Sequence, residues 1–343
     1  MSNPIVGAAV RGAPLNQGVM RFMDRRDWRG VFPAITTPFR ADYSVDHEAL
    51  ARHVAWMIDS GCAAIVPLGS LGESATLSFT EKVEILRTCC DAAAGRARVV
   101  AGIAGLVTAE CVALAREAER AGCDGIMALP AYVYYSDWRE TRAHYSAIIG
   151  ATSLSCMLYN NPIAYRTDVT APQLAELASI HENLHAMKES GGDVRRVTAV
   201  CEELGDRLAV FAGLDDMILE AIPAGATGWI AGLVNALPVE SVRLFELATA
   251  GQWKDATALY HWFLPLLRLD TVPKFVQLIK LVQAEVGRGS PTVRPPRLTL
   301  EGDALHEALG MIRRQLERRP ALNGSGGQTA FRIDGTPIAL SAR

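Results

Sequence analysis

The feature that most constrains the fold of this chain is a regular alternation of short apolar segments with stretches of helical periodicity. Eight apolar segments follow one another, at residues 30–39, 63–68, 99–103, 125–128, 155–159, 184–188, 209–212 and 228–231. Strands that alternate with helices form a parallel sheet, because each helix carries the chain back to the same edge. Eight such units in about 200 residues predict an α/β fold of the (β/α)8 TIM-barrel type.

A doubly wound sheet is the alternative fold, but it normally carries a glycine-rich phosphate loop. The sequence has neither a GxGxxG nor a Walker motif. We place the barrel at residues 29–235 and expect a C-terminal helical appendage, residues 236–320, that packs on it. Residues 1–28 are predicted to form a flexible N-terminal leader, and residues 321–343 a flexible tail.

Composition narrows the class of protein. Half of the 343 residues are hydrophobic and the formal net charge is −3, so a large core is possible and no nucleic-acid partner is indicated. No apolar run reaches the roughly 18 residues that a membrane span needs. The seven cysteines are scattered, with no spacing typical of a disulfide framework or a metal site. We therefore expect a cytoplasmic protein without a metal.

The sixth apolar segment ends in a single lysine. The residues L-H-A-M precede Lys188, and E-S-G-G follows it. A run this short and apolar is typical of a strand buried on both faces. Burial lowers the pKa of a lysine, and the neutral amine forms a Schiff base with a carbonyl group. A lysine that caps the strand and reaches solvent is the alternative.

Polar or reactive groups follow five of the predicted strands, which matters because TIM barrels perform catalysis at the carboxyl ends of their strands. These groups are the turn G-S-L-G-E-S at 69–74, Tyr132, Tyr159, Lys188 and the segment A-G-L-D-D at 212–216. The backbone N–H groups of the turn are able to hold a carboxylate, although an ordinary strand-to-helix turn is the alternative. Tyr159 is suited to move protons near a Schiff base, unless it is simply a buried aromatic. Because Tyr159 and Lys188 end neighbouring predicted strands, the pair favours an active site over the alternative of isolated buried residues.

Seven segments resemble, in the same order, motifs of the dihydrodipicolinate synthase and N-acetylneuraminate lyase family of class I (Schiff-base) aldolase-type enzymes. They read G-V-F-P-A-I-T-T-P-F, G-S-L-G-E-S-A-T-L, L-P-A-Y, L-Y-N-N-P, M-K-E-S-G, F-A-G-L-D-D and G-A-T-G-W-I. The resemblance covers residues 30–319. It implies a TIM barrel that acts on a small 2-oxo acid through a covalent Schiff base, without a cofactor. It also implies a homo-oligomer, a tetramer or dimer of dimers.

The resemblance implies roles for the catalytic positions. Lys188 would join the ketone carbon of the 2-oxo acid, and Tyr159 would shuttle a proton at that centre. Ser70, with the backbone of Gly69, Leu71 and Gly72, would hold the substrate carboxylate.

It also implies roles for residues further out. Tyr132 matches a tyrosine that family members place at a subunit contact near the site, and Ile230 matches a residue whose carbonyl faces the lysine. Gly213 lies on the strand end that carries Asp215. Asp215 matches an acidic position that binds the distal part of the substrate in the lyase branch.

Two departures from the family bear on the substrate. The synthase branch reads G-T-T-G-E where this chain reads G-S-L-G-E, so Ser70 keeps the first hydroxyl and Leu71 lacks the second. In synthases, the resemblance implies, the second hydroxyl belongs to a proton relay, so its loss disfavours lysine-pathway synthesis. Synthases also carry an arginine that binds the carboxylate of the second substrate. Arg166 matches it only across a segment about two residues longer.

An apolar residue at position 71 resembles catabolic branches, notably 1-pyrroline-4-hydroxy-2-carboxylate deaminase. We therefore predict a catabolic lyase or hydro-lyase that acts on a 2-oxo acid or cyclic imine, either this deaminase or a 2-oxo-acid aldolase or dehydratase. Two alternatives stay open. One is a 4-hydroxy-tetrahydrodipicolinate synthase, which condenses pyruvate with aspartate semialdehyde, and the other is a non-catalytic ligand-binding barrel.

Overall fold

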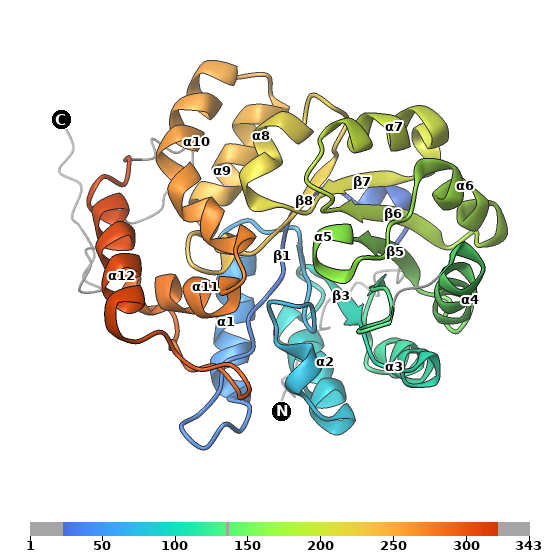
Figure 1. Cartoon of the computed structure of the whole chain (residues 1–343), viewed down its shortest axis with the longest axis horizontal. Coiled ribbons are helices and arrows are strands. Elements are labelled where there is room, and N and C mark those ends of the chain that lie inside the picture. The colour runs from blue at the N-terminus through green and yellow to red at the C-terminus, as the bar shows by residue number, and fades with distance from the viewer. Residues whose placement is uncertain (1–22, 135–136, 322–343) are drawn as a thin grey trace, which may run out of the picture.

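Eight parallel strands form a barrel at the centre of the computed structural model, which describes residues 23–134 and 137–321 (Figure 1). The strands are β1 (Gly30–Pro33), β2 (Ala64–Ile65), β3 (Arg98–Ile103), β4 (Gly125–Ala128), β5 (Ser155–Asn160), β6 (Leu184–Glu189), β7 (Ala209–Ala212) and β8 (Gly228–Ala231). They are hydrogen-bonded in the order β1-β8-β7-β6-β5-β4-β3-β2, and a parallel bridge between Ala34 and Val66 closes the circle. The predicted TIM barrel is confirmed.

Side chains alternate between the two faces of each strand and so divide the core into two clusters. On β5, Met157 and Tyr159 point into the barrel with Phe32 and Phe211. Cys156 and Leu158, from the same strand, belong to the larger cluster between the barrel and the helices. This period-2 alternation follows from the pleat of the strand. It decides which residues at the strand ends face the mouth of the barrel.

Helices surround the strands in the order expected for this fold (Figure 1). They are α1 (His47–Asp59), α2 (Phe79–Ala93), α3 (Thr108–Arg120), α4 (Trp138–Ile149), α5 (Pro162–Tyr165), α6 (Ala171–Ile180), α7 (Arg195–Leu204) and α8 (Ile218–Ala221), followed by α9 (Pro238–Thr249), α10 (Trp253–Leu267), α11 (Phe275–Glu285) and α12 (Gly302–Glu317). Capping boxes at Ser78 and Thr170 begin α2 and α6, as the sequence pattern predicts. Within the described ranges, no helix combines the length and apolarity that crossing a membrane requires.

Three elements differ from the sequence-based expectation. The first strand ends at Pro33 rather than at residue 39, because Thr36 and Thr37 turn to bond Gln283 and the carbonyl of Gly72. The helix that the alternation predicts between the apolar segments 209–212 and 228–231 is a 3-10 turn, η4 (Asp215–Met217), followed by the single helical turn α8. The short helix α5 was not predicted at all. It begins at Pro162, where Asn161 caps the N–H of Ala164.

The packed chain begins earlier than residue 29. A 3-10 turn, η1 (Arg25–Asp27), precedes the first strand. Met23 and Trp28 are buried inside the barrel cluster, and the indole N–H of Trp28 donates to the hydroxyl of Ser155 at 2.7 Å. Residues 23–28 therefore close the amino-terminal end of the barrel instead of forming part of a leader. The rest of the predicted leader, residues 1–22, and the predicted tail from residue 322 lie outside the described residues.

Helices α9 to α12 gather on one side of the barrel, with α12 outermost (Figure 1). A buried ion pair ties this group to the turn after β2, because Lys280 of α11 donates to Glu73 at 2.6 Å. Both side chains are almost completely buried. The same ammonium donates to the carbonyls of Thr37 and Thr292. The C-terminal helices are thereby fixed beside the mouth of the barrel.

Replacing Lys280 with Met should destabilise the protein by about 3 kcal/mol, because it leaves the Glu73 carboxylate buried without its main partner. Arg96→Met is the matched control: it removes an ion pair whose partner, Asp59, is 64% exposed. We expect this control to cost no more than about 1 kcal/mol. Urea denaturation of both variants measures the difference. Equal small losses would show that the buried pair does not hold the C-terminal helices.

Candidate active site

The mouth of the barrel lies at the carboxyl ends of the strands. The residues that face it are of two kinds, reactive side chains such as those of Tyr159 and Lys188, and very small residues such as Gly213. Tyr159 and Lys188 are opposite each other in the register of β5 and β6. Gly213 follows β7, and a Cβ at this position would lie 2.8 Å from Cε of Lys188 and 2.0 Å from the hydroxyl oxygen of Ser190. Only glycine leaves room there for the lysine side chain. Gly213 therefore shapes the space around Lys188.

Lys188 is 7% exposed and lies against an aromatic ring. Its Nζ is 4.3 Å from the centroid of the Tyr159 ring. Burial lowers the pKa of this amine to about 8, although the nearby carboxyl groups of Asp270 and Asp215 oppose the shift. A substantial fraction of the amine is thus neutral near physiological pH. A neutral amine in this setting is a competent nucleophile for a carbonyl carbon.

Tyr159 is held in place from both ends. Its hydroxyl oxygen accepts a hydrogen bond from the side-chain amide of Asn161 at 2.9 Å. Its backbone carbonyl accepts one from the hydroxyl of Tyr145 at 3.0 Å. Burial raises the pKa of the Tyr159 phenol, so the group keeps its proton. The phenol is therefore able to donate a proton close to Lys188.

A second tyrosine, Tyr165, joins the site from the end of α5. Its hydroxyl forms a short hydrogen bond with the hydroxyl of Ser70. Its ring stacks on Tyr132 at 5.5 Å and meets the Tyr159 ring edge-on at 5.9 Å. Tyr165 was not predicted from the sequence, although the segment L-Y-N-N-P ends only three residues before it. Four hydroxyl groups of one chain, those of Ser70, Tyr132, Tyr159 and Tyr165, are thus gathered at the mouth.

The turn at 69–72 has the features of a carboxylate-binding turn. The hydroxyl of Thr37 donates to the carbonyl of Gly72 at 2.7 Å, which fixes the turn from below. A Cβ at position 72 would lie 3.0 Å from the carbonyl oxygen of Ile35, so a larger residue does not fit easily. In the part of the chain that the structure describes, the N–H groups of Ser70 and Leu71 have no acceptor. Free N–H groups in such a turn are suited to an anion.

The side chain of Leu71 does not face the mouth of the barrel, which corrects the interpretation that it influences the choice of substrate. Its side chain is 3% exposed and lies in the cluster between the barrel and the helices, not in the barrel cluster. A substrate at the mouth is therefore able to meet the backbone of Leu71 but not its side chain. The hydroxyl that bridges the site is that of Ser70. The leucine consequently gives no reason to exclude the synthase reaction.

Asp215 also differs from its expected role. The residue is completely buried, and its carboxylate accepts hydrogen bonds from the N–H groups of Gly232 and Leu233 at 2.7 to 3.1 Å. Burial raises its pKa to about 6, against the pull of these N–H groups and of Lys188. With no exposed surface it does not reach the distal part of a substrate. It instead holds the end of β8 next to Lys188.

The remaining predicted residues lie around this centre. Ile230 is buried in the barrel cluster below the mouth, and Tyr132 is half-buried against Tyr165. Arg166 is exposed at the carboxyl end of α5, where its φ is +60°. Asp270, which the sequence analysis did not identify, is close enough to Lys188 to influence its pKa. It is contributed by the 3-10 turn η6 (Arg268–Thr271), far from the barrel motifs in the sequence.

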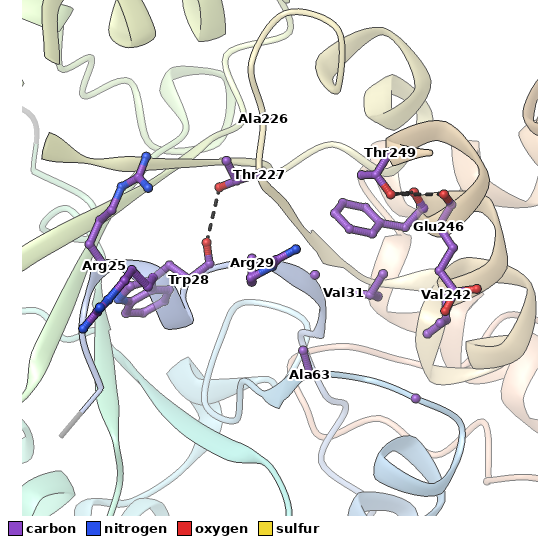
Figure 2. Close-up of a pocket in the computed structure, with 14 residues that line it drawn as sticks. Arg25, Trp28, Arg29, Val31, Ala63, Ala226, Thr227, Val242, Glu246 and Thr249 are labelled. Carbon is purple, nitrogen blue, oxygen red and sulfur yellow. Dashed lines mark hydrogen bonds between the residues drawn. The ribbon is translucent and has the colours of Figure 1, made fainter. Parts of the chain in front are cut away.

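A cavity of about 640 Å³ lies at the opposite end of the barrel (Figure 2). Its walls include Arg25, Arg29 and Thr227, and Thr227 donates to the carbonyl of Trp28. Because it opens at the amino-terminal ends of the strands, away from Lys188, it is not the place of the covalent chemistry. Across the described ranges, no three His, Cys, Asp or Glu side chains are grouped so as to hold a metal ion.

Comparisons with known proteins agree with this geometry. A family model described as the dihydrodipicolinate synthetase family matches residues 27–315. The 4-hydroxy-tetrahydrodipicolinate synthase of Chloroherpeton thalassium is 30% identical over 282 residues, 82% of this chain and 93% of that protein. The corresponding synthase of Methanosphaerula palustris is 34% identical over 244 residues, 70% of this chain and 83% of that protein.

A solved structure gives the same picture. The dihydrodipicolinate synthase of Acinetobacter baumannii, complexed with pyruvate, has a TM-score of 0.78 at 27% identity and covers 84% of this chain and 98% of its own. Fold and family together define a TIM-barrel lyase of the class I aldolase type. The chain belongs to the dihydrodipicolinate synthase family.

Because burial lowers its pKa to about 8, the Lys188 amine should become reactive at lower pH than a solvated lysine. Competitive acetylation with trace acetic anhydride between pH 6 and 10, followed by peptide mass spectrometry, measures this for each lysine. The reactivity of Lys188 should rise with pH, reach half of its plateau near pH 8 and level off by about pH 9, since only the neutral amine reacts. The exposed Lys254 serves as the internal reference. A Lys188 curve that keeps climbing to pH 10 would contradict the desolvated site.

Proposed function

We propose that this enzyme forms a Schiff base between Lys188 and the ketone carbon of a small 2-oxo acid and needs no cofactor. The observation that carries the proposal is the pairing of a buried lysine of lowered pKa with Tyr159 at the mouth of the barrel. The turn at 69–72 would hold the carboxylate of the substrate through the N–H groups of Ser70 and Leu71. Lys188, Tyr159 and this turn would then contact the ketone, its oxygen and the carboxylate, respectively.

The proposed first step is a condensation that releases water. Nζ of Lys188 attacks the ketone carbon, the C–N bond forms, and the former carbonyl oxygen leaves as water after it has received protons. Tyr159 would supply one proton. The hydroxyl of Tyr165, which bonds that of Ser70 and whose ring lies edge-on to the Tyr159 ring, would pass a replacement proton to Tyr159 once the substrate is bound. The resulting cationic imine then accepts electrons when a proton is removed from the neighbouring carbon. The reactive product of this stage is an enamine.

For the second half of the reaction, the synthase is the first candidate. The curated relatives described above are named 4-hydroxy-tetrahydrodipicolinate synthase, and the departure at Leu71 no longer counts against that activity. In this reaction the enamine of pyruvate would attack the aldehyde carbon of aspartate semialdehyde. Arg166 stays a proposed partner for the carboxylate of this second substrate. At about 30% identity, the names of the relatives support the reaction class more strongly than the substrate.

A catabolic lyase or hydro-lyase, such as the deaminase or a 2-oxo-acid aldolase or dehydratase, is the second candidate. The observation that favours it is the carboxyl group of Asp270 beside Lys188. An acidic group at the mouth is suited to a substrate that carries hydroxyl or amino groups. It is less suited to a second carboxylate.

Assembly into a homo-oligomer is also proposed. Val133 and Tyr134, directly after the half-buried Tyr132, are 95% and 62% exposed. Leu106 and Val107, on the connection after the neighbouring strand β3, are 67% and 57% exposed. Large apolar side chains grouped on adjoining connections are typical of a subunit contact. Such a contact would cover Tyr132 and its surroundings.

Borohydride reduction in the presence of pyruvate should attach the ligand to Lys188 and to no other residue. Peptide mass spectrometry locates the adduct, and Lys188→Ala should abolish it. Turnover of pyruvate with aspartate semialdehyde, assayed in parallel with turnover of 4-hydroxy-pyrroline-carboxylate, then separates the two candidates. An adduct without turnover of any substrate would favour a ligand-binding barrel. The absence of an adduct with every 2-oxo acid tried would refute the proposal.

Replacing Tyr165 with Phe should lower kcat about 100-fold, because it removes the hydroxyl that is proposed to pass a proton from Ser70 to Tyr159. Schiff-base trapping should persist, since Lys188 and the carboxylate turn are untouched. Tyr43→Phe is the control, because Tyr43 lies outside the proposed subunit contact, is 45% exposed, and its hydroxyl forms no hydrogen bond among the described residues. Steady-state kinetics under one set of conditions gives the comparison. An unchanged kcat in the Tyr165 variant would remove this residue from the proton path.

A further inference from the structure

The carboxyl group of Asp270 occupies the mouth of the barrel although the residue belongs to the C-terminal helices. It lies on η6, which packs against η4 at the end of β7. Its Oδ1 is buried and has no hydrogen-bond partner in the described part of the chain. A buried carboxyl oxygen without a partner is unfavourable unless something else satisfies it. A substrate group is the natural candidate at the mouth of an enzyme.

Gly232 makes the room for this carboxyl group. Gly232 directly follows β8, whose inward-facing residue nearest the mouth is Ile230. A Cβ on Gly232 would lie 2.0 Å from Oδ1 and 2.4 Å from Cγ of Asp270. Any other residue there would collide with the carboxyl group. Asp270 thus takes the place that a strand residue would otherwise fill in the ring around the mouth.

The electrostatics agree with this placement. The charge of Asp270 acts on both Lys188 and Tyr159, yet Asp270 and Lys188 form no ion pair among the described residues. The Asp270 carboxyl group and the Lys188 amine therefore lie at the same mouth without an ion pair that would occupy it. Burial and the neighbouring Asp215 raise the pKa of Asp270 well above its ordinary value. The carboxyl group is consequently able to carry a proton near neutral pH.

We propose that Asp270 is the acid–base group for a hydroxyl or amino substituent on the second carbon beyond the imine carbon of the Lys188 adduct. The substrate class would be 2-oxo acids that bear such a substituent at C4, or the aldehydes that generate it in the reverse direction. This inference rests on the proposed Schiff base. It assigns a residue to the second half of the reaction, the step at C4 of the substrate. Tyr159 and Ser70 are proposed to act in the first half, at the ketone and the carboxylate.

Cleavage and elimination use Asp270 in opposite protonation states, and both balance. In cleavage, ionised Asp270 takes the proton of the C4 hydroxyl, the C3–C4 bond breaks, and its electron pair enters the imine to give an enamine and an aldehyde. In elimination, protonated Asp270 gives its proton to the C4 hydroxyl as the enamine expels it, which releases water and leaves a conjugated imine. An amino group leaves as ammonia in the same way. No oxidant, reductant or further reactant is needed.

The neighbouring carboxyl groups are not placed for this task. Both oxygens of Asp215 are occupied by the N–H groups of Gly232 and Leu233. Asp216 faces Arg268, at 3.8 Å. Asp216→Asn is therefore a matched control, since it removes an adjacent carboxylate of the same size from outside the mouth.

The test compares wild type, Asp270→Asn and Asp216→Asn in two NMR assays. The first follows exchange of the pyruvate methyl protons in D₂O, which needs only the Schiff base and the enamine. The second follows cleavage or dehydration of 4-hydroxy-2-oxobutanoate and racemic 4-hydroxy-2-oxopentanoate, neither of which carries a second carboxylate, and condensation of pyruvate with the corresponding aldehydes, formaldehyde and acetaldehyde. We expect Asp270→Asn to keep exchange within about threefold and to lose the second reaction by about 100-fold or more. Asp216→Asn should behave as wild type in both assays.

Three outcomes would overturn the assignment. If Asp270→Asn keeps the second reaction within threefold, the carboxyl group is not needed. If it loses exchange and the second reaction equally, Asp270 only tunes Lys188. If wild type exchanges pyruvate protons but turns over none of these C4 compounds, the substrate class is wrong while the Schiff base stands. A wild type that neither exchanges nor traps pyruvate removes the proposed function itself, and the role of Asp270 with it.

Discussion

Desolvation of one amine is the constraint on which the rest of this structure depends. A lysine at the end of a buried parallel strand loses hydration that its charged form requires, so its neutral form becomes accessible. The closed barrel supplies that environment by surrounding Lys188 with backbone and aromatic surface. Asp215 and Asp270 oppose the shift and keep the pKa near 8 rather than far lower. The site is therefore balanced between a charged and a neutral lysine.

Glycines at two strand ends leave space around Lys188, and side chains from other parts of the chain occupy it. Gly213 leaves room for Lys188 and Ser190, and Gly232 leaves room for Asp270. The C-terminal helices bring that carboxyl group to the mouth, and the buried Lys280–Glu73 pair anchors the same helices next to the turn at 69–72. The proposed role of Asp270 would make these helices part of the active site.

The barrel was predictable from the sequence, because short apolar runs that alternate with helical stretches are a local signal. The residues at the ends of those runs led to Lys188, Tyr159 and the turn at 69–72, and the family resemblance added a role for Ser70. The structure brings these residues to one mouth, where their catalytic roles stay a prediction. Contacts between distant segments were not predictable: Asp270 is 82 residues from Lys188 in the sequence, and no local pattern marks it. The face on which Leu71 lies was misjudged for a related reason. A turn has no fixed period, so only the three-dimensional path shows that its side chain points away from the mouth.

The most direct test of the central claim is a crystal structure of the enzyme soaked with pyruvate at pH 8. The account predicts continuous density from Nζ of Lys188 to the ketone carbon, with the carboxylate bound by the N–H groups of Ser70 and Leu71. It also predicts that Oδ1 of Asp270 faces the methyl carbon of the adduct across open space. Pyruvate bound away from Lys188, or a lysine side chain turned out to solvent beside an empty mouth, would contradict it.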